Sequence, residues 1–219
     1  IGAERPFAPA VGDIDHDGRL DAVVLERDGA LHAFTDFAQP ESNAGPQYFA
    51  RFPLSVGFHP STDPILADLD RDGKLEIVVA GEGQVVGYAH NGVIASDFPV
   101  TIGPRNAPDT ATAALLAVDF GADLLSILTG GSERATLAYR QGREVQTANY
   151  AVGGDITTSL ALATNTVTNQ PVIYARASDG YLYAFIAPSP SSTPATAIWA
   201  MGGRDARNTR AIPDADLNP

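Results

Sequence analysis

Two segments of the sequence carry carboxylates at alternate positions, a spacing that suits the binding of a hard metal ion. Residues 13–21 read DIDHDGRLD, and residues 68–76 read DLDRDGKLE. Ca²⁺ takes about six to eight oxygen ligands at ~2.3–2.6 Å. Without a cation, carboxylates this close in the chain would repel one another. The two segments therefore predict two calcium sites.

The alternation assigns a ligand set to each loop. Acids at every second position can turn toward one centre, and Gly18 permits the tight turn that follows them. In the first loop the expected ligands are Asp13, Asp15, Asp17, the carbonyl of Arg19, and Asp21; in the second they are Asp68, Asp70, Asp72, the carbonyl of Lys74, and Glu76.

Two other interpretations of the acidic segments were weighed. An EF-hand loop needs a Glu at its twelfth position and a helix after it. The twelfth positions here are Val24 and Val79, and both lie in β-type runs, so the EF-hand fails. A pair of solvated acidic turns without metal is the remaining alternative. The recurrence of the full pattern at equivalent places favours metal binding.

The acidic segments belong to a longer internal repeat. Asp13 and Asp68 are 68 − 13 = 55 residues apart, and each is followed by a Val-rich run of strand length. An aromatic residue then marks each copy: Phe34, Tyr88, Tyr139 and Phe185 lie 21, 20, 20 and 21 residues after Asp13, Asp68, Asp119 and Thr164.

Four repeats of this kind predict an all-β fold. A repeat of about 45–55 residues is the length of one four-stranded propeller blade. We therefore expect a β-propeller with about four four-stranded blades, at approximately residues 3–57, 58–103, 104–153 and 154–211, followed by a flexible tail or linker at residues 212–219.

With these loops and strands, residues 9–103 resemble FG-GAP/VCBS repeats, the calcium-binding blades of integrin-α-type β-propellers that are also common in secreted bacterial proteins. The resemblance implies structural metals that fix the loop between the first two strands of a blade. It also implies a secreted, extracellular or cell-surface protein, with cell adhesion among the expected roles. The resemblance is weak beyond residue 103, although residues 198–209, IWAMGGRDARNT, resemble the end of such propellers.

The third and fourth repeats depart from the ligand pattern. The third keeps two acids, Asp119 and Asp123, in a shortened loop, whereas the fourth has no carboxylate in residues 164–169. The lost ligand charge predicts no calcium in the fourth repeat and argues against an ion in the third. The sequence leaves open whether Asp119 and Asp123 bind a third ion.

The ends of the sequence suggest a part of a larger propeller. Ile1 and Gly2 match the end of a repeat, and residues 198–201 supply a candidate outer strand for the fourth blade. An open stack of blades would expose apolar faces, which soluble proteins avoid. We therefore expect the C-terminal half of a propeller of about seven or eight blades. Its expected partners are the missing upstream blades of the same precursor or a second copy.

Composition excludes several other functions. The formal net charge is −12 and no Lys/Arg cluster occurs, so nucleic acid is not an expected partner. The absence of cysteine excludes disulfides and thiolate metal sites. No apolar run reaches the ~18 residues that a membrane span requires.

No set of residues has a catalytic spacing. The four histidines show neither an H-x-H nor an H-E-x-x-H spacing, and no G-x-S-x-G motif occurs. Tyr181, Tyr183 and Phe185 alternate along one predicted strand, which suits core packing and, alternatively, a platform on which sugar rings stack.

Together these features predict a calcium-stabilised extracellular β-propeller module that recognises or scaffolds protein or glycan and is not an enzyme by itself. The alternative is an accessory or catalytic part of a larger secreted hydrolase, such as a peptidase, or of a polysaccharide lyase. Propellers of the family that the sequence resembles occur in both settings.

Overall fold

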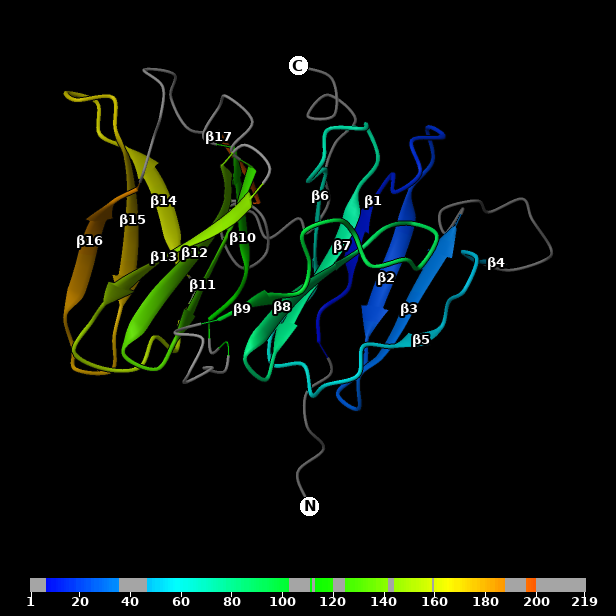
Figure 1. Cartoon of the computed structure of the whole chain (residues 1–219), viewed down its shortest axis with the longest axis horizontal. Coiled ribbons are helices and arrows are strands. Elements are labelled where there is room, and N and C mark those ends of the chain that lie inside the picture. The colour runs from blue at the N-terminus through cyan, green and yellow to red at the C-terminus, as the bar shows by residue number, and fades with distance from the viewer. Residues whose placement is uncertain are drawn as a thin grey trace.

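The chain folds into four antiparallel sheets that stand side by side in a row (Figure 1). A computed structural model describes residues 7–35, 47–102, 111, 113–119, 125–141, 144–158, 160–187 and 196–199. The first sheet lies at the right of Figure 1 and the fourth at the left. In these ranges no helix is long and apolar enough to cross a membrane. The predicted all-β fold is confirmed.

The first two sheets follow the order of their strands along the chain. The first sheet has the order β1-β2-β3-β4, with β5 also paired to β3. Its strands are β1 (Ala10–Gly12), β2 (Asp21–Leu25), β3 (Ala30–Thr35), β4 (Gln47–Tyr48) and β5 (Leu54–Ser55). The second sheet has the order β6-β7-β8-β9. Its strands are β6 (Ile65–Ala67), β7 (Glu76–Gly81), β8 (Gln84–Tyr88) and β9 (Val100–Thr101).

The third sheet includes a strand from the far end of the chain. Its order is β13-β12-β11-β10-β17. Its strands are β10 (Leu116–Asp119), β11 (Leu125–Gly131), β12 (Arg134–Gln141), β13 (Glu144–Ala151) and β17 (Thr196–Trp199). The fourth sheet has the order β14-β15-β16, with β14 (Ala161–Thr164), β15 (Pro171–Arg176) and β16 (Leu182–Ile186).

The four aromatic markers occupy equivalent places in the four sheets. Each lies on the strand of its sheet that comes third along the chain, opposite a residue of the strand before it. The pairs are Phe34 with Ala22, Tyr88 with Ile77, Tyr139 with Ser126, and Phe185 with Ile173. The sequence offsets of the aromatic residues therefore identify corresponding strands in the four sheets.

The placement of the last strand differs from the prediction. Residues 198–201 were expected as the outer strand of the fourth blade, but β17 pairs with β10 of the third sheet, where Ala117 lies opposite Trp199. The reason is the edge of β10, whose residues Leu116, Ala117 and Val118 are fully buried. Buried N–H and C=O groups need partners, and β17 supplies them. The exposed strand β16 can use water instead.

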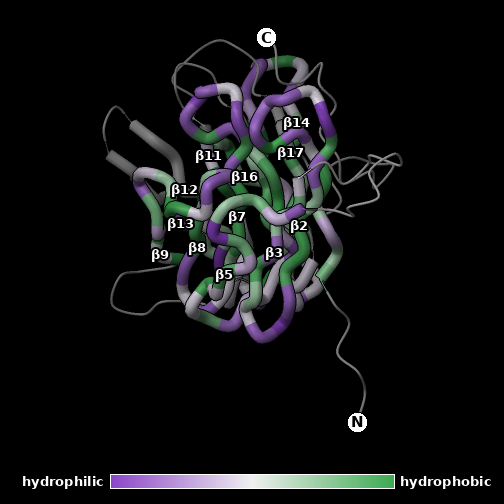
Figure 2. Tube along the Cα trace, turned by 90° about the vertical axis from the view of Figure 1, so that its right-hand side faces the viewer, coloured by the Kyte–Doolittle hydropathy of each residue, from purple (hydrophilic) through white to green (hydrophobic). Residues whose placement is uncertain are grey.

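Side-chain alternation decides which face of each sheet is buried. On the first sheet, Val23, Leu25, Leu31 and Ala33 belong to one core cluster with Ile77 of the second sheet. A second cluster joins the third sheet to the fourth. Figure 2 shows the apolar colour along the strands, whereas hydrophilic residues gather in the loops at the two ends of the sheets.

Gly81 ends β7 where the preceding loop passes close to the sheet. A Cβ at this position would overlap the carbonyl oxygen of His59 and lie 2.7 Å from the Phe58 ring. We expect Gly81→Ala to destabilise the fold by about 3 kcal/mol, because backbone must move to admit the methyl group.

Gly57→Ala is the matched control for this substitution. Gly57 has a φ of +81°, and a Cβ there would meet nothing within 4 Å. Gly57→Ala should therefore lower the free energy of unfolding by only about 1 kcal/mol, the strain of a left-handed backbone at alanine. Urea unfolding of both variants measures the difference, and equal midpoints would show that the contact with the His59 carbonyl is not limiting.

Candidate metal centres

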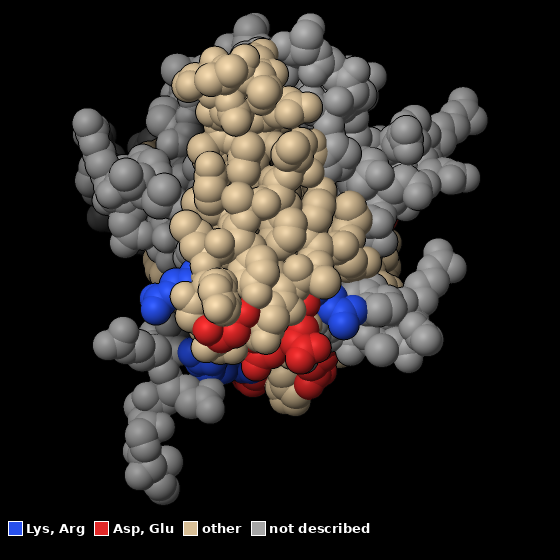
Figure 3. Space-filling view, turned by 90° about the vertical axis from the view of Figure 1, so that its left-hand side faces the viewer, with Lys and Arg blue, Asp and Glu red and all other residues tan. Residues whose placement is uncertain are grey.

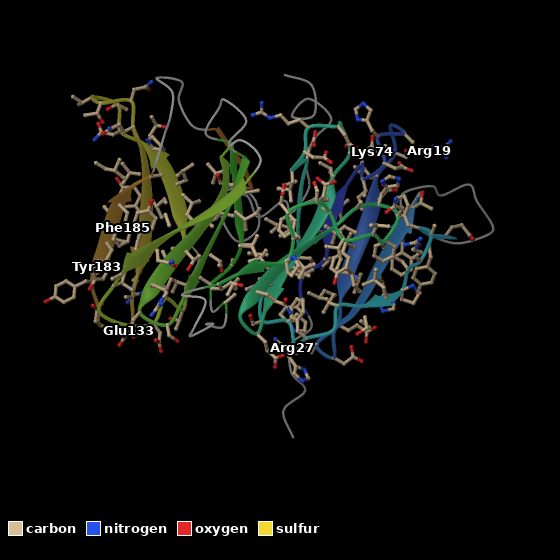
Figure 4. The ribbon with its side chains drawn as sticks, in the orientation of Figure 1. Arg19, Arg27, Lys74, Glu133, Tyr183 and Phe185 are labelled. Atoms are coloured by element: carbon tan, nitrogen blue, oxygen red, sulfur yellow. The ribbon has the colours of Figure 1, made fainter. Side chains whose placement is uncertain are left out.

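The two acidic loops lie at the same end of neighbouring sheets. The first connects β1 to β2, and the second connects β6 to β7. Arg19 and Lys74, one in each loop, are both at the top of Figure 4, whereas Arg27 and Glu133 are at the bottom. The Leu75 N–H donates to the Ile14 carbonyl at 3.0 Å and so joins one loop to the other.

The first loop is wrapped around its own carboxylates. Asp13 accepts hydrogen bonds from the N–H groups of Asp17 at 2.9 Å and Gly18 at 2.8 Å. Asp21, the first residue of β2, accepts one from the Ile14 N–H at 2.8 Å. The chain reverses through positive φ angles at His16 (62°) and Gly18 (85°). These turns bring the start of the loop back to the start of the strand.

The second loop repeats most of this arrangement. Asp68 accepts a hydrogen bond from the Gly73 N–H at 3.0 Å, and Glu76 accepts one from the Leu69 N–H at 2.7 Å. Positive φ angles recur at Arg71 (62°) and Gly73 (87°). The same positions therefore serve the same purpose in loops that are 55 residues apart.

Three carboxylates converge in each loop. In the first, one oxygen each of Asp13, Asp15 and Asp17 lie within 4.8 Å of one another. In the second loop, Asp68, Asp70 and Glu76 converge within the same limit. Each triad can hold a metal ion, because hard divalent cations take carboxylate oxygens as ligands.

The other predicted ligands stand beside these triads. Asp72 accepts a hydrogen bond from the Lys74 N–H at 2.8 Å, and Asp17 accepts one from the Arg19 N–H at 2.9 Å. Coordination by the carbonyls of Arg19 and Lys74 stays a prediction. The acid that begins the second strand differs between the loops: Glu76 reaches its triad and Asp21 does not. The glutamate side chain is longer by one methylene group.

Burial and mutual repulsion raise the pKa of several of these acids. Burial raises the pKa of Glu76 to about 8, with Asp70, Asp68 and Asp72 adding to the effect and the Leu69 N–H opposing it. Burial also raises the pKa of Asp68 and Asp15, with neighbouring carboxylates contributing in both cases. The protein alone thus leaves negative charge under-compensated in both loops.

Two carboxylate oxygens give an independent test of whether a cation fits. Oδ1 of Asp15 and Oδ1 of Asp68 are buried and accept no hydrogen bond from the described residues. A buried acceptor without a donor costs about 1–3 kcal/mol, and more when it is charged. A cation in each triad would satisfy these oxygens, so the residues present fit a metal.

The fourth repeat closes its loop without acids. The side-chain oxygen of Asn165 accepts hydrogen bonds from the N–H groups of Val167 at 2.9 Å and Thr168 at 3.1 Å. An amide therefore takes the turn-closing role that a carboxylate has in the first two loops. In the third repeat, Asp123 and the side chain of Asp119 lie outside the described residues, so the structure does not test whether they bind a third ion.

The aromatic residues of the fourth sheet divide between the core and the surface. Tyr183 and Phe185 pack on the core cluster between the third and fourth sheets. The Tyr183 hydroxyl donates to Asp179 at 2.5 Å and accepts from the Gly153 N–H at 2.9 Å. Tyr181 is 70% exposed. Two of the three residues therefore have the packing role, and sugar stacking on this strand stays a prediction.

No histidine joins either carboxylate triad of the described residues, although the charge of His90 opposes the rise in the pKa of Asp15. His32 is on β3, where its Nε2 is 3.0 Å from a Glu26 oxygen and its Nδ1 is 3.2 Å from the Tyr48 hydroxyl. His90 makes an edge contact with the Phe49 ring. Sequence reasoning missed the contact between His32 and Tyr48 on the first sheet, because β4 has only two residues and gives no periodic signal.

The arrangement of the sheets matches solved β-propeller structures. A crystal structure of BBS1N in complex with ARL6DN, soaked with lead, aligns with a TM-score of 0.56 and 16% identity, over 84% of this chain and 52% of that chain. The same complex soaked with mercury aligns with a TM-score of 0.53 and 17% identity, over 82% and 50%. The chain therefore has a β-propeller-like fold that resembles the BBS1 N-terminal domain, and it spans about half the length of that domain. No protein-family model and no curated protein matches the sequence.

Two equivalent loop positions give a matched test of the metal assignment. Asp70 belongs to the second triad, and Thr166 is exposed in the corresponding loop of the fourth repeat. In 1 mM CaCl₂, we expect Asp70→Ala to lower the melting temperature by about 5–10 °C, because a lost site removes roughly 2.7 kcal/mol at 100-fold saturation. Thr166→Ala should shift it by about 2 °C or less.

The sign of the effect should change when the metal is chelated. Asp70 raises the pKa of Glu76 by repulsion, so Asp70→Ala relieves that repulsion in the metal-free loop. Calorimetric melts in EDTA should therefore show Asp70→Ala at or above the wild type. An equal loss of stability with and without calcium would mean that Asp70 acts through packing instead of through an ion.

Proposed function

We propose that this chain is a calcium-stabilised β-propeller module of the FG-GAP/VCBS kind that scaffolds or recognises extracellular protein or glycan and is not an enzyme by itself. The observation that carries the proposal is the matched pair of acidic loops. Each gathers three carboxylates, and each leaves one buried carboxylate oxygen without a donor.

The chemistry of the loops favours Ca²⁺ over other common ions. The candidate ligands are all oxygen atoms, whereas zinc sites take His or Cys ligands, and the sequence has no cysteine. Mg²⁺ needs near-ideal octahedral geometry and keeps several of its waters. Loops with five oxygen ligands each, drawn from side chains and a carbonyl, suit the larger and more adaptable Ca²⁺.

The role of the ions in this proposal is structural. Each would neutralise the acids between the first two strands of a sheet and so hold the loop against the strand that it precedes. Extracellular modules bind calcium at about 10⁻⁴–10⁻³ M, close to its concentration outside cells. This supports a secreted or cell-surface location. The loops at the two ends of the sheets are then free to vary and to bind a ligand.

Calcium should raise the stability of the chain, and its removal should lower it. Rigid loops with four carboxylates can bind more tightly than a typical extracellular module, and for a Kd of about 10⁻⁵ M, 1 mM calcium adds roughly 2.7 kcal/mol per site. Scanning calorimetry in calcium, in EDTA, and in magnesium at equal concentration measures this contribution. We expect the melting temperature to be highest in calcium. Coincident curves in calcium and EDTA would remove the basis of the proposal.

Ligand recognition should depend on the same ions. We expect the chain to bind a glycan or an extracellular protein on arrays in 1 mM CaCl₂ and to lose that binding in EDTA, because the end loops are ordered by the metal. Asp70→Ala and Thr166→Ala serve as the disrupted and control variants. Release of cleaved peptide or unsaturated sugar from the array would instead indicate a catalytic part of a hydrolase or lyase.

A further inference from the structure

The fourth sheet has one covered face and one open face. Ile173 and Ala175 are buried in the core cluster shared with the third sheet. The opposite face carries Val172, Tyr174 and Arg176 on the central strand, Ala161 and Ala163 on one side, and Leu182, Ala184 and Ile186 on the other. Leu182 is 69% exposed and Ile186 is 61% exposed. Large apolar side chains of one strand thus point away from the core together.

Figure 3 looks directly at this end of the row. Uncharged residues cover the face over most of its height, and acidic and basic residues gather only at its lower end. Leu182 and Ile186 are large apolar side chains that are exposed on this sheet, and exposed apolar surface marks interaction sites in soluble proteins.

The first sheet ends the row in a similar way. Its inner face is buried, and its outer face carries Val24 and the rings of His32, Phe34 and Tyr48. The Phe34 and Tyr48 rings lie 4.6 Å apart, and Phe34 stacks on His32 at 6.1 Å. Broad aromatic surface of this kind suits packing against an aliphatic sheet.

We propose that the outer face of the fourth sheet docks on the outer face of the first sheet of a second copy of this chain, so that two copies close one ring of eight sheets. The chain aligns with 52% of a β-propeller chain at a TM-score of 0.56, which supports a row of four sheets as about half of such a fold. A two-fold axis then creates the same junction twice.

Charge and area support this occupant. Glu26 directly follows the second strand of the first sheet, where one of its oxygens is 3.0 Å from His32 Nε2, and it stays exposed. Arg176 ends the second strand of the fourth sheet and is also exposed, so the junction brings opposite charges to the same level. Three strands of about five residues cover roughly 240 Å² at ~4.8 Å between strands and ~3.4 Å per residue. Four such faces give about 1,000 Å², the lower limit of a specific interface.

Sedimentation equilibrium of the whole chain in calcium tests the proposal. The expected mass is 45.8 kDa, twice the 22.9 kDa of one chain. Ile186→Glu places a charge in the junction and should give 22.9 kDa with an unchanged circular dichroism spectrum. Val167→Glu is the control, because Val167 is 91% exposed in a turn away from this face. It should leave the dimer intact.

A charge exchange identifies the two faces that meet. Arg176→Glu should weaken the dimer at least tenfold, and addition of Glu26→Arg should restore most of that loss. Three results would overturn the proposal: a wild-type monomer, which assigns the face to another protein or another part of a longer polypeptide; a mass that grows beyond the dimer; or an Ile186→Glu variant as dimeric as the wild type.

Discussion

The carboxylates of Asp21 and Glu76 begin two buried strands at a place that water does not reach. Their residues are 0% and 3% exposed, and each carboxylate accepts one N–H from its own loop. A buried carboxylate needs such donors, because burying a charge without compensation costs several kcal/mol. In each loop the chain therefore doubles back over the start of the strand. In the second loop, Glu76 also converges with Asp68 and Asp70, at a point where a cation can bind.

The sheets depend on a second constraint, the need to cover apolar faces and to pair buried edges. Inner faces such as Val23 and Leu31 are covered by the next sheet, and the buried edge of β10 is paired by β17. The sheets thus cover their inner apolar faces by stacking, and the chain pairs the buried edge of β10 with a distant strand. Within the described residues, no sheet covers the outer faces of the first and fourth sheets.

Local features were predictable because the sequence states them directly. The 55-residue offset, the acids and Gly18 define the loops, and the aromatic markers define the third strands. The partner of β17 could not be predicted, because it begins 196 − 119 = 77 residues after the end of β10 and strand pairing over that distance has no local signal. The difference between Asp21 and Glu76 depends on one methylene group and becomes visible only in three dimensions. Likewise, the alternation in β16 shows two faces but not which neighbouring sheet covers one of them.

The hydrogen bond from the Leu75 N–H to the Ile14 carbonyl crosses the seam between the first two sheets. Ile14 lies between Asp13 and Asp15, and Leu75 directly precedes Glu76, so neither loop can shift without displacing a residue adjacent to the acids of the other. Two ions bound at these loops would hold the first two sheets together at neighbouring points. A force that pulls the sheets apart at this end would be shared between the two sites, and the loss of one ion would weaken the other site.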